Sequence, residues 1–544
     1  MTIPATQHAI QITGVDQIEV NPAKPVDAVG PTQVLLQVEA CGICFSDTKL
    51  LHAFDSHPRK SDIVSGLTAE ELAQIPSYKP GSAVTVPGHE PVGRIVAVGD
   101  AVTHFAVGDR VLVQADWKHL KTARSNGAFG YNFEGALQEY VVIDERCVVS
   151  PSGEKFLLPV SDEPSAAAVG LIEPWATVEA AYAAHERRGL LEGGRLLLVA
   201  DEGAEVTSAL VLADAAKSDV SAVSPAEVGA LAGQTFDDII YFGSDAGVLS
   251  TLGDLLGLRA ILNVVLDGAT MDGPVKVDVG RVHYDYIRYC GTTGSDAAEG
   301  YAWIPETGEL RADDKVAIVG AAGPMGLMHT MRTVTLGSDG IAVASVDATD
   351  LNDDRLAHLA VEIDPVAAER GVPVRYVNTG SSPLEGGYDY VTVMVPVPAL
   401  VAQAIDLAAA GGVVNAFAGI PAGTYAEVDL QHVIADRVFV FGTSGSDVSD
   451  MATVLRKIES GIIDTTISLD AVCGIAGFND AIESVMNRTS GGKIMVYPQL
   501  PDLGLVRLVD MPEKWPEVAA LLAEVAALLD DGRWTVEAEK ALLG

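Results

Sequence analysis

Hydrophobic residues recur in short runs through the first 150 residues, with glycine and aspartate between the runs. Runs at 33–38, 93–98, 110–113 and 139–143 are rich in Val, Ile and Leu. Short apolar runs bounded by Gly and Asp are typical of β-strands and the turns that join them. The first part of the chain is therefore predicted to be β-rich.

From residue 193 onward the pattern changes to apolar strands followed by helices. Residues 195–200 and 315–320 are apolar runs of strand length, and each precedes a segment with helical character. A further strand is expected at 341–346, after the second of these helices. Strands that alternate with helices predict βαβ units around a parallel sheet.

Two pairs of similar sequences lie at nearly the same offset. Residues 236–242 parallel 388–394 at an offset of 152 (388 − 236), and Gly-Thr-Thr-Gly-Ser-Asp from 291 parallels Gly-Thr-Ser-Gly-Ser-Asp from 442 at 151 (442 − 291). A near-constant offset indicates a duplicated unit, although chance similarity of common strand and turn residues is an alternative. We predict two βαβ domains in tandem, joined by a linker at 298–310.

Composition narrows the classes of partner. The chain has 544 residues, of which 48% are hydrophobic, and 35 Lys and Arg against 74 Asp and Glu give a net charge of −39. Two to four domains are expected at this length. So acidic a surface repels nucleic acid and anionic lipid, and we expect neither as a partner. Five scattered cysteines and the absence of a signal pattern favour a cytoplasmic protein.

Three short motifs carry candidate metal chemistry. They are Cys41-Gly-Ile-Cys44, Gly-His89-Glu90 and Glu173-Pro. A structural zinc site needs four ligands, and the chain has no second Cys-x-x-Cys pair. A cysteine, a histidine and a glutamate can instead form a catalytic zinc site with an open fourth position. Glu90 is an alternative or exchanging ligand to Glu173.

A glycine-rich segment after the strand at 315–320 is a candidate dinucleotide site. Its glycines permit a tight turn and close approach to a pyrophosphate, whose charge the following helix N-terminus would bind. An acid at the end of the next strand would bind ribose hydroxyls and favour NAD over NADP, and Asp347 has the better spacing for this role. The residues expected at the pyrophosphate are Gly320, Gly323, Pro324, Met325 and Gly326.

Taken in order, these motifs resemble the zinc-dependent medium-chain dehydrogenase/reductase family, in its sorbitol-dehydrogenase-like branch. The resemblance covers most of residues 1–190 and 310–500. It implies an α/β fold with a β-rich part: a GroES-like catalytic domain and two tandem Rossmann domains, the first degenerate. The implied domains are 1–188 completed by 451–500, a degenerate Rossmann-like domain at 189–300, an NAD-binding Rossmann domain at 311–450, and a helical C-terminal extension at 501–544.

The resemblance also implies roles for individual residues. Cys44, rather than Cys41, is the expected zinc ligand. Asp47 matches the acid that orients a metal-binding histidine, and Ser46 matches a hydroxyl that relays the substrate proton. Lys49 stands where many relatives carry a relay histidine, so it would shuttle a proton or face a substrate anion.

Two further positions are assigned to the cofactor by the resemblance. Thr177 matches a position beside the nicotinamide. Asp350 matches the family wording after the ribose acid, so it is preferred slightly over Asp347. In the first copy, Asp201, Glu202 and Glu205 stand where phosphate would lie, and these charges predict that this copy binds no dinucleotide.

The chain also departs from the family pattern. Residues 114–139 contain none of the four cysteines of the family's structural zinc lobe, so one catalytic zinc and no structural zinc is expected. An inserted segment at 54–84 contains a predicted helix at 65–74. Around its start lies a basic cluster, which is either a solvated loop or a wall that meets an anionic substrate group. The members of this basic cluster are Lys49, His52, His57, Arg59 and Lys60.

These expectations combine into a zinc- and NAD-dependent dehydrogenase of a polyol, sugar or related secondary alcohol. A sugar-phosphate reductase is the enzymatic alternative, and a non-catalytic binding protein is the alternative of another class. The two copies are expected to dock within the chain through 286–290 and 438–441, as a monomer that imitates the family dimer, although a homodimer remains an alternative. A final docking helix is predicted at 517–529.

Overall fold

The computed structural model describes residues 3–336, 340–511, 519–530 and 532–544. The chain divides into two compact units, residues 1–176 with 446–544 and residues 177–445. None of the described helices has both the length and the hydropathy needed to cross a bilayer.

The first unit is built on an eight-stranded sheet in the order β10-β6-β5-β3-β25-β24-β26, with β9 also paired to β3. Strands β24 and β25 come from the C-terminal part of the chain and complete this sheet beside β3. The strands are β3 (Gln33–Ile43), β5 (Glu90–Val98), β6 (Arg110–Val113), β9 (Tyr140–Asp144), β10 (Leu157–Pro159), β24 (Leu469–Cys473), β25 (Lys493–Val496) and β26 (Val506–Arg507).

Smaller elements surround this sheet. Strands β1 (Thr6–Gly14) and β2 (Gln17–Pro25) form a hairpin. A three-stranded sheet, β4-β7-β8, contains β4 (Ile63–Ser65), β7 (Asp116–Thr122) and β8 (Asn126–Ala128). The α-helices of this unit are α1 (Phe45–Ala53), α2 (Ala69–Leu72), α3 (Glu145–Val148), α4 (Ala166–Gly170), α14 (Val448–Glu459), α15 (Phe478–Met486), α16 (Ala519–Ala527) and α17 (Val536–Leu543), and α5 (Ile172–Ala183) continues into the second unit.

The C-terminal extension packs on the first unit through a buried carboxylate. Glu539 of α17 accepts hydrogen bonds from the backbone N–H groups of Ala166 and Ala167, at 2.5 and 2.9 Å, and from the Tyr497 hydroxyl at 2.8 Å. A carboxylate at a helix N-terminus satisfies free N–H groups and complements the helix dipole, so Glu539 caps α4. The start of the helix predicted at 517–529 lies outside the described residues, and α16 begins at Ala519.

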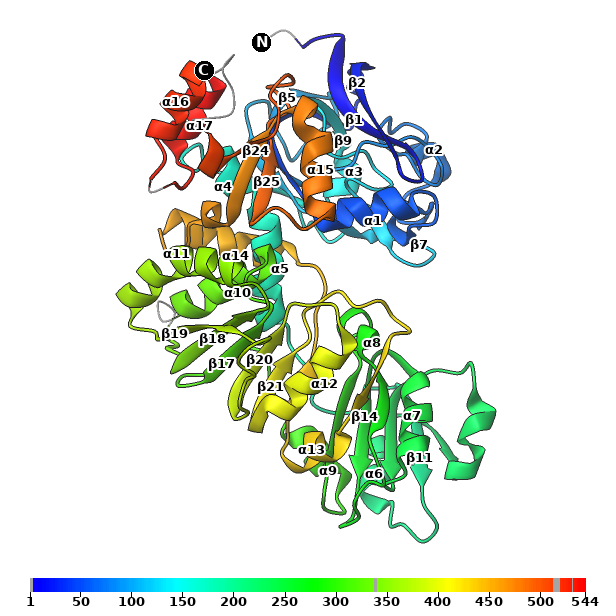
Figure 1. Ribbon diagram of the computed structural model, residues 1–544. Helices are drawn as coiled ribbons and strands as arrows, with labels where there is room; N and C mark the ends of the chain where they lie inside the picture. Colours follow the sequence, from blue (N-terminus) through cyan, green and yellow to red (C-terminus); the bar gives the residue numbers. More distant parts are fainter. Residues whose placement is uncertain (1–2, 337–339, 512–518, 531) are drawn as a thin grey trace. The chain divides into compact units, whose positions relative to one another are not determined.

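The second unit contains two parallel sheets with helices on their faces (Figure 1). The second copy has six strands in the order β19-β18-β17-β20-β21-β23, which is the Rossmann order 3-2-1-4-5-6. Its strands are β17 (Lys315–Val319), β18 (Ser345–Asp350), β19 (Val374–Asn378), β20 (Tyr388–Val393), β21 (Ala408–Asn415) and β23 (Phe439–Phe441), and its helices are α10 (Pro324–Thr335), α11 (Asp353–Arg370), α12 (Pro398–Leu407) and α13 (Leu430–Ala435).

One predicted strand of this copy was placed wrongly. The strand expected at 341–346 is β18, which begins at Ser345 and ends at Asp350. Its register is fixed by parallel pairing with β17, in which Lys315 lies opposite Ser345. The apolar residues before Ser345 belong to the connection from α10, because pairing rather than local hydrophobicity sets where the strand begins.

The first copy has five strands in the order β12-β11-β13-β14-β16. The strand that would lie outside β12 is absent from its described sheet, and the 3₁₀ helix Pro225–Leu231 leads toward β13 instead. A degenerate Rossmann domain was expected, and this fold class is confirmed. The strands are β11 (Arg195–Ala200), β12 (Asp219–Val223), β13 (Phe236–Phe242), β14 (Leu256–Val265) and β16 (Arg288–Thr292), and the helices are α6 (Thr207–Ala216), α7 (Ala246–Asp254), α8 (Val279–Tyr284) and α9 (Ala297–Ala302).

The two copies pack against each other through equivalent elements. Strands β15 (Val275–Asp278) and β22 (Tyr425–Val428) form an antiparallel pair in which Lys276 lies opposite Glu427. These two residues are 151 positions apart (427 − 276), the same offset as the repeated glycine-rich segments. Residues 286–290 and 438–441 are largely buried, and Arg288 donates a 3.1 Å hydrogen bond to the carbonyl of Gly442. One hydrophobic core is shared by both copies.

Candidate metal and cofactor sites

Three side chains of the first unit bring metal-binding atoms together. Cys44 follows β3 and caps α1, His89 precedes β5, and Glu90 is the first residue of β5. One ligand atom from each lies within 4.8 Å of the others. Strands β3 and β5 are antiparallel with Gly42 opposite Glu90, and this register is what brings the two motifs to one place.

Glu90 is held from one side and left open on the other. Lys493 of β25 donates a 2.6 Å hydrogen bond to Glu90 Oε1, and both side chains are buried. Glu90 Oε2 is buried without a hydrogen-bond partner among the described residues. A side chain at Gly42 would place its Cβ 2.1 Å from Oε2, so glycine leaves room for this oxygen. Sulfur, nitrogen and oxygen donors with one orphaned carboxylate oxygen fit a zinc ion.

Ser46 and Asp47 contact the two ring nitrogens of His89. Ser46 Oγ lies 3.0 Å from Nε2, and Asp47 Oδ1 lies 3.2 Å from Nδ1. Asp47 also accepts a 2.9 Å hydrogen bond from the Cys44 backbone N–H. Burial opposes the charged form of His89, but Tyr131 and Asp47 outweigh it and raise the pKa of His89 well above its usual range.

Glu173 lies in the first turn of α5, near the other acid of the site but outside the group of three. Burial and the neighbouring Glu90 raise the pKa of Glu173 to about 7, while His89 and Lys493 act in the opposite direction. Glu173 therefore shares the electrostatic environment of the three donors. Thr177, four residues further along α5, is half-buried in the second unit.

Two residues of the site carry no motif in the sequence. Tyr131 is buried, and its ring centroid lies 5.5 Å from that of His89. Lys493 comes from a strand 403 residues after Glu90. Lys493 stands in a Gly-Gly-Lys segment that resembles the family's closing strand, and this was the only signal toward it. Lys49 is exposed on α1, with its ammonium 6.0 Å from the Phe45 ring centroid.

The glycine-rich turn of the second copy has the shape expected for phosphate binding. Gly320 has a positive φ of 84°, and its N–H donates to the carbonyl of Thr349 at 3.0 Å. Gly323 caps α10 without a side chain, and Pro324 is its first residue. A Cβ on Gly326 would lie 2.4 Å from the carbonyl oxygen of Gly320, so only glycine allows the helix to approach the turn. Met325 occupies the first turn of α10.

The two candidate ribose acids have different surroundings. Asp347 lies within β18 and is 1% exposed, and it accepts hydrogen bonds from Arg375 at 2.5 and 2.7 Å and from Tyr388 at 2.5 Å. Asp350 is the last residue of β18 and accepts a 2.8 Å hydrogen bond from the Leu351 N–H. The end of the second strand is where a ribose acid lies in Rossmann domains.

The corresponding turn of the first copy is acidic. Asp201 accepts a 3.1 Å hydrogen bond from the Tyr241 hydroxyl, and Glu205 accepts one at 3.0 Å from the N–H of Thr207 at the start of α6. Glu202 is exposed beside them. Negative charges at this helix start compete with phosphate for the same N–H groups.

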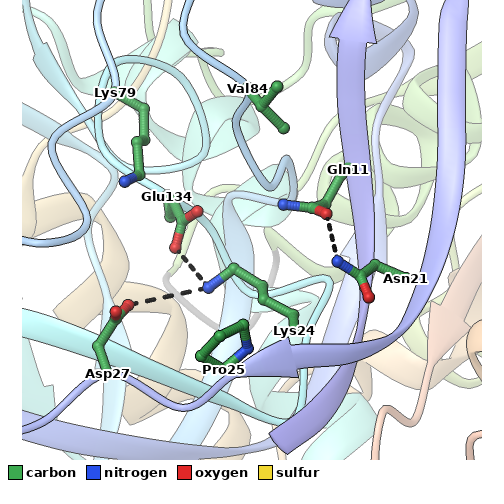
Figure 2. Close-up of a pocket in the computed structure, with 8 residues that line it drawn as sticks. All are labelled: Gln11, Asn21, Lys24, Pro25, Asp27, Lys79, Val84 and Glu134. Carbon is green, nitrogen blue, oxygen red and sulfur yellow. Dashed lines mark hydrogen bonds and ion pairs between the residues drawn. The ribbon is translucent and has the colours of Figure 1, made fainter.

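A polar cavity of about 250 Å³ lies away from these donors, beneath the β1–β2 hairpin (Figure 2). Lys24 is paired there with Glu134 at 2.9 Å and with Asp27 at 3.8 Å. Burial raises the pKa of Glu134, although Lys24 opposes the rise. The central charges are paired with each other, and the pair of Lys24 with Glu134 links β2 of the hairpin to the segment that follows β8. Its lining residues are Gln11, Asn21, Lys24, Pro25, Asp27, Lys79, Val84 and Glu134.

Comparison with known proteins identifies the family. Residues 30–152 match the model of the alcohol dehydrogenase GroES-like domain. Over 326 residues the chain is 28% identical to the uncharacterized protein YggP of Escherichia coli (strain K12), covering 56% of this chain and 71% of that protein. The matched segment is similar to the GroES-like domain of alcohol dehydrogenases, and both findings support a medium-chain alcohol dehydrogenase. The resemblance stated from the motifs is thus confirmed.

Two dehydrogenases are also similar to this chain. A mannitol-1-phosphate 5-dehydrogenase of Aliivibrio fischeri (strain ATCC 700601 / ES114) is 28% identical over 294 residues, covering 51% of this chain and 64% of that protein. Among solved structures, 2R,3R-butanediol dehydrogenase from Bacillus subtilis aligns with a TM-score of 0.51 and 17% identity, covering 91% of this chain and 100% of that chain. The structural match shows the shared fold.

Proposed function

We propose that this alcohol dehydrogenase family member is a zinc-dependent enzyme that transfers a hydride between NAD(H) and a secondary alcohol or ketone, with a polyol or sugar as substrate. The observation that carries the proposal is the group of Cys44, His89 and Glu90, whose donor atoms lie within 4.8 Å of one another. The glycine turn at the start of α10 supports the cofactor half of the proposal.

The zinc ligands are Cys44, His89 and a carboxylate. Glu173 was the expected carboxylate. Glu90 has the stronger support, because one of its oxygens lies close to the other donors and its Oε2 has no hydrogen-bond partner among the described residues. Zinc at this site would polarise an alcohol or carbonyl oxygen and favour the alkoxide at neutral pH. One catalytic zinc per chain is proposed, since β7 and β8 occupy residues 116–128 and the 114–139 lobe has no cysteine.

The side chains around His89 orient its ring and transfer the proton of the substrate hydroxyl. Asp47 holds Nδ1, which leaves Nε2 to face the metal position. Ser46, 3.0 Å from Nε2, is placed to accept the proton of a substrate hydroxyl and pass it on. Lys49 is exposed on the next turn of α1, where it would accept that proton or contact a charged part of the substrate.

The second copy binds the dinucleotide in this proposal. The N–H groups at the start of α10 would hold the pyrophosphate, and the nicotinamide would supply the hydride acceptor. Asp350 would bind the ribose, because Asp347 is occupied by Arg375 and Tyr388. Thr177 would lie beside the nicotinamide. An acid at the ribose repels a 2′-phosphate, so NAD is favoured over NADP.

Two other functions remain as alternatives. A sugar-phosphate reductase is favoured by the basic residues of the inserted segment and by the similarity to a relative named mannitol-1-phosphate 5-dehydrogenase. A non-catalytic binding protein would keep the fold without the chemistry, as the first copy has done with its acidic turn.

Metal analysis, NADH fluorescence and a dehydrogenase screen test the proposal together. We expect one zinc per chain, NADH binding to one site per chain, and NAD reduction with at least one polyol, sugar or sugar phosphate. A protein with neither zinc nor NADH binding would leave only the non-catalytic alternative. Two NADH sites per chain would show that the first copy still binds a dinucleotide.

The contact between the two copies bears on the oligomeric state of the chain. In support, β15 of the first copy pairs with β22 of the second, residues 286–290 and 438–441 are largely buried, and Arg288 donates a hydrogen bond to the carbonyl of Gly442. We therefore propose that the chain is a monomer containing an internal pseudo-dimer, while a homodimer through other surfaces is the alternative.

A further inference from the structure

The basic cluster of the inserted segment separates into two groups. His52 pairs with Asp16 at the surface of the first unit. Lys60 is fully buried and donates to the backbone carbonyls of Lys79 and Ala83, the latter at 2.8 Å. Both side chains are therefore already paired within the first unit.

Two other members, His57 and Arg59, lie against the ring of Tyr131. His57 and Tyr131 have ring centroids 5.1 Å apart, and the guanidinium carbon of Arg59 lies 5.3 Å from the Tyr131 centroid. The same ring lies 5.5 Å from His89, the proposed zinc ligand. The inserted segment therefore places His57 and Arg59 against Tyr131, and the ring of Tyr131 separates them from the metal-binding group.

Arg59 is positioned by an acid but remains accessible. Its Nη2 donates a 3.0 Å hydrogen bond to Asp116, and 30% of its side chain is exposed. A guanidinium carries five N–H donors in a fixed fork, so one carboxylate does not exhaust it. Asp116 also cancels part of its charge, so an anion held here needs a second cation. Lys49 is exposed on α1 and close enough to His57 to influence it electrostatically, so it is the candidate for that second cation.

His57 adds an uncharged donor. Its Nδ1 accepts a 3.2 Å hydrogen bond from the backbone N–H of Arg59. Burial, followed by the nearby Arg59 and Lys49 cations, lowers the pKa of His57 to about 4. His57 is therefore neutral at physiological pH, and Nε2 carries the ring proton.

We propose that Arg59, His57 and Lys49 bind a phosphate monoester on the substrate, which narrows the polyol or sugar of the proposed function to its phosphorylated form. The inference rests on the proposed function, because the metal-binding group fixes where the reacting carbon lies. Guanidinium and ammonium groups form charge-assisted hydrogen bonds with phosphate oxygens. In a chain with a net charge of −39, a dianion is repelled by most of the surface, and local cations must overcome that repulsion.

Steady-state kinetics with sorbitol and sorbitol 6-phosphate test the inference. We expect the wild-type enzyme to prefer the phosphate ester in kcat/KM. Arg59→Gln should lower this preference by about 10- to 100-fold, mainly through KM, because charged hydrogen bonds to phosphate are lost. Arg59→Lys should retain part of the preference for the phosphate ester, since lysine keeps the positive charge but lacks the planar guanidinium with its several donors. Arg507→Gln, which removes an arginine paired with Asp470 elsewhere in the first unit, is the matched control and should leave the preference unchanged.

Titration calorimetry with inorganic phosphate gives a readout that needs no turnover. The full-length protein should bind phosphate more weakly when it carries Arg59→Gln, and also when it carries Lys49→Gln, a substitution at an exposed position. Equal or better turnover of sorbitol by the wild type, or phosphate binding that neither substitution weakens, would overturn the inference. If neither substrate reacts and zinc is absent, the proposed function fails, and the phosphate titration still decides whether the anion site exists.

Discussion

Lys493 and Glu90 form a buried ion pair, with Nζ 2.6 Å from Oε1, at the edge of the proposed metal site. Burial opposes the charged form of Lys493, but Glu90 outweighs burial and raises the pKa of the lysine. The pair fixes Oε1 of Glu90, while Oε2 has no hydrogen-bond partner among the described residues. A residue from the C-terminal part of the chain thus positions a donor from the N-terminal part.

Removing this lysine should destabilise the protein and weaken the metal site. Lys493→Met leaves the Glu90 carboxylate buried without its cation, which costs about 3 to 5 kcal/mol. Urea denaturation of the apoprotein measures the loss. The double variant Lys493→Met/Glu90→Gln should recover part of it, because the uncompensated charge is gone. A single variant as stable as the wild type would show that the pair does not hold Glu90.

Substitutions of the donors distinguish the two carboxylates. Cys44→Ser and His89→Ala should each abolish turnover and lower the zinc content found by atomic emission. Glu90→Gln should lower zinc content more than Glu173→Gln if Glu90 is the ligand, and the reverse order would restore Glu173. Asp47→Asn should lower zinc affinity by about 10- to 100-fold, because it orients His89. Full activity of the His89 variant would contradict the zinc mechanism.

Substitution of the two candidate ribose acids, Asp350 and Asp347, should have different effects on NAD binding and on stability. Asp350→Ala should weaken NAD binding and relax the bias against NADP in fluorescence titrations, with little change in melting temperature. Asp347→Ala should lower the melting temperature instead, because Tyr388 and Arg375 lose their acceptor. NAD binding that depends on Asp347 alone would reverse this assignment.

The surroundings of Asp347 also predict that the stability of the protein depends on pH. Burial favours its neutral form, but hydrogen bonds from Arg375 and Tyr388 outweigh burial and lower the pKa of Asp347. A depressed carboxylate pKa stabilises the fold above the ordinary aspartate range, and this stability is lost as the pH falls through that range. The drop in melting temperature between neutral and acidic pH should therefore be smaller in Asp347→Asn than in the wild type.

The C-terminal extension should contribute to stability through Glu539. Glu539→Gln weakens the cap of α4 and its bond to Tyr497, which costs about 1 to 2 kcal/mol in chemical denaturation. Glu537→Gln, an exposed neighbour in the same helix, is the control and should leave the free energy of unfolding unchanged. Equal effects of the two substitutions would mean that overall charge, and not the cap, is responsible.

Light scattering tests the internal pseudo-dimer. A single species near the chain mass of 56.7 kDa is expected at micromolar concentration. A species of twice that mass would support the homodimer alternative, and a structure would then show which surfaces meet.

Much of this fold could be predicted because its signals are local. The strand at 110–113, the strand at 195–200 and the glycine turn before α10 each carry their pattern within a few residues. Strand β18 was misplaced because its paired segment includes Asp347 and Thr349, whose polar side chains are satisfied by neighbouring segments.

The residues of the candidate site divide in the same way, into those with a local sequence signal and those placed by the fold. Cys44 and His89 belong to recognisable motifs, whereas Tyr131 and Lys493 join them only through folding. Their contacts cross tens to hundreds of residues and depend on which strands pair. The basic cluster was visible in the sequence. Only the structure shows that Lys60 and His52 are paired within the first unit, whereas Arg59 keeps an exposed part.

The pairing of Lys276 with Glu427 has an evolutionary consequence. In a homodimer joined through this strand, the central residue would face its own copy, and a lysine there would meet a lysine. Within one chain the two positions diverge independently, so each can acquire the charge that suits the other. Fusion also delivers both halves in equal amounts, which lets the first half abandon its phosphate turn without ever forming an inactive pair with itself.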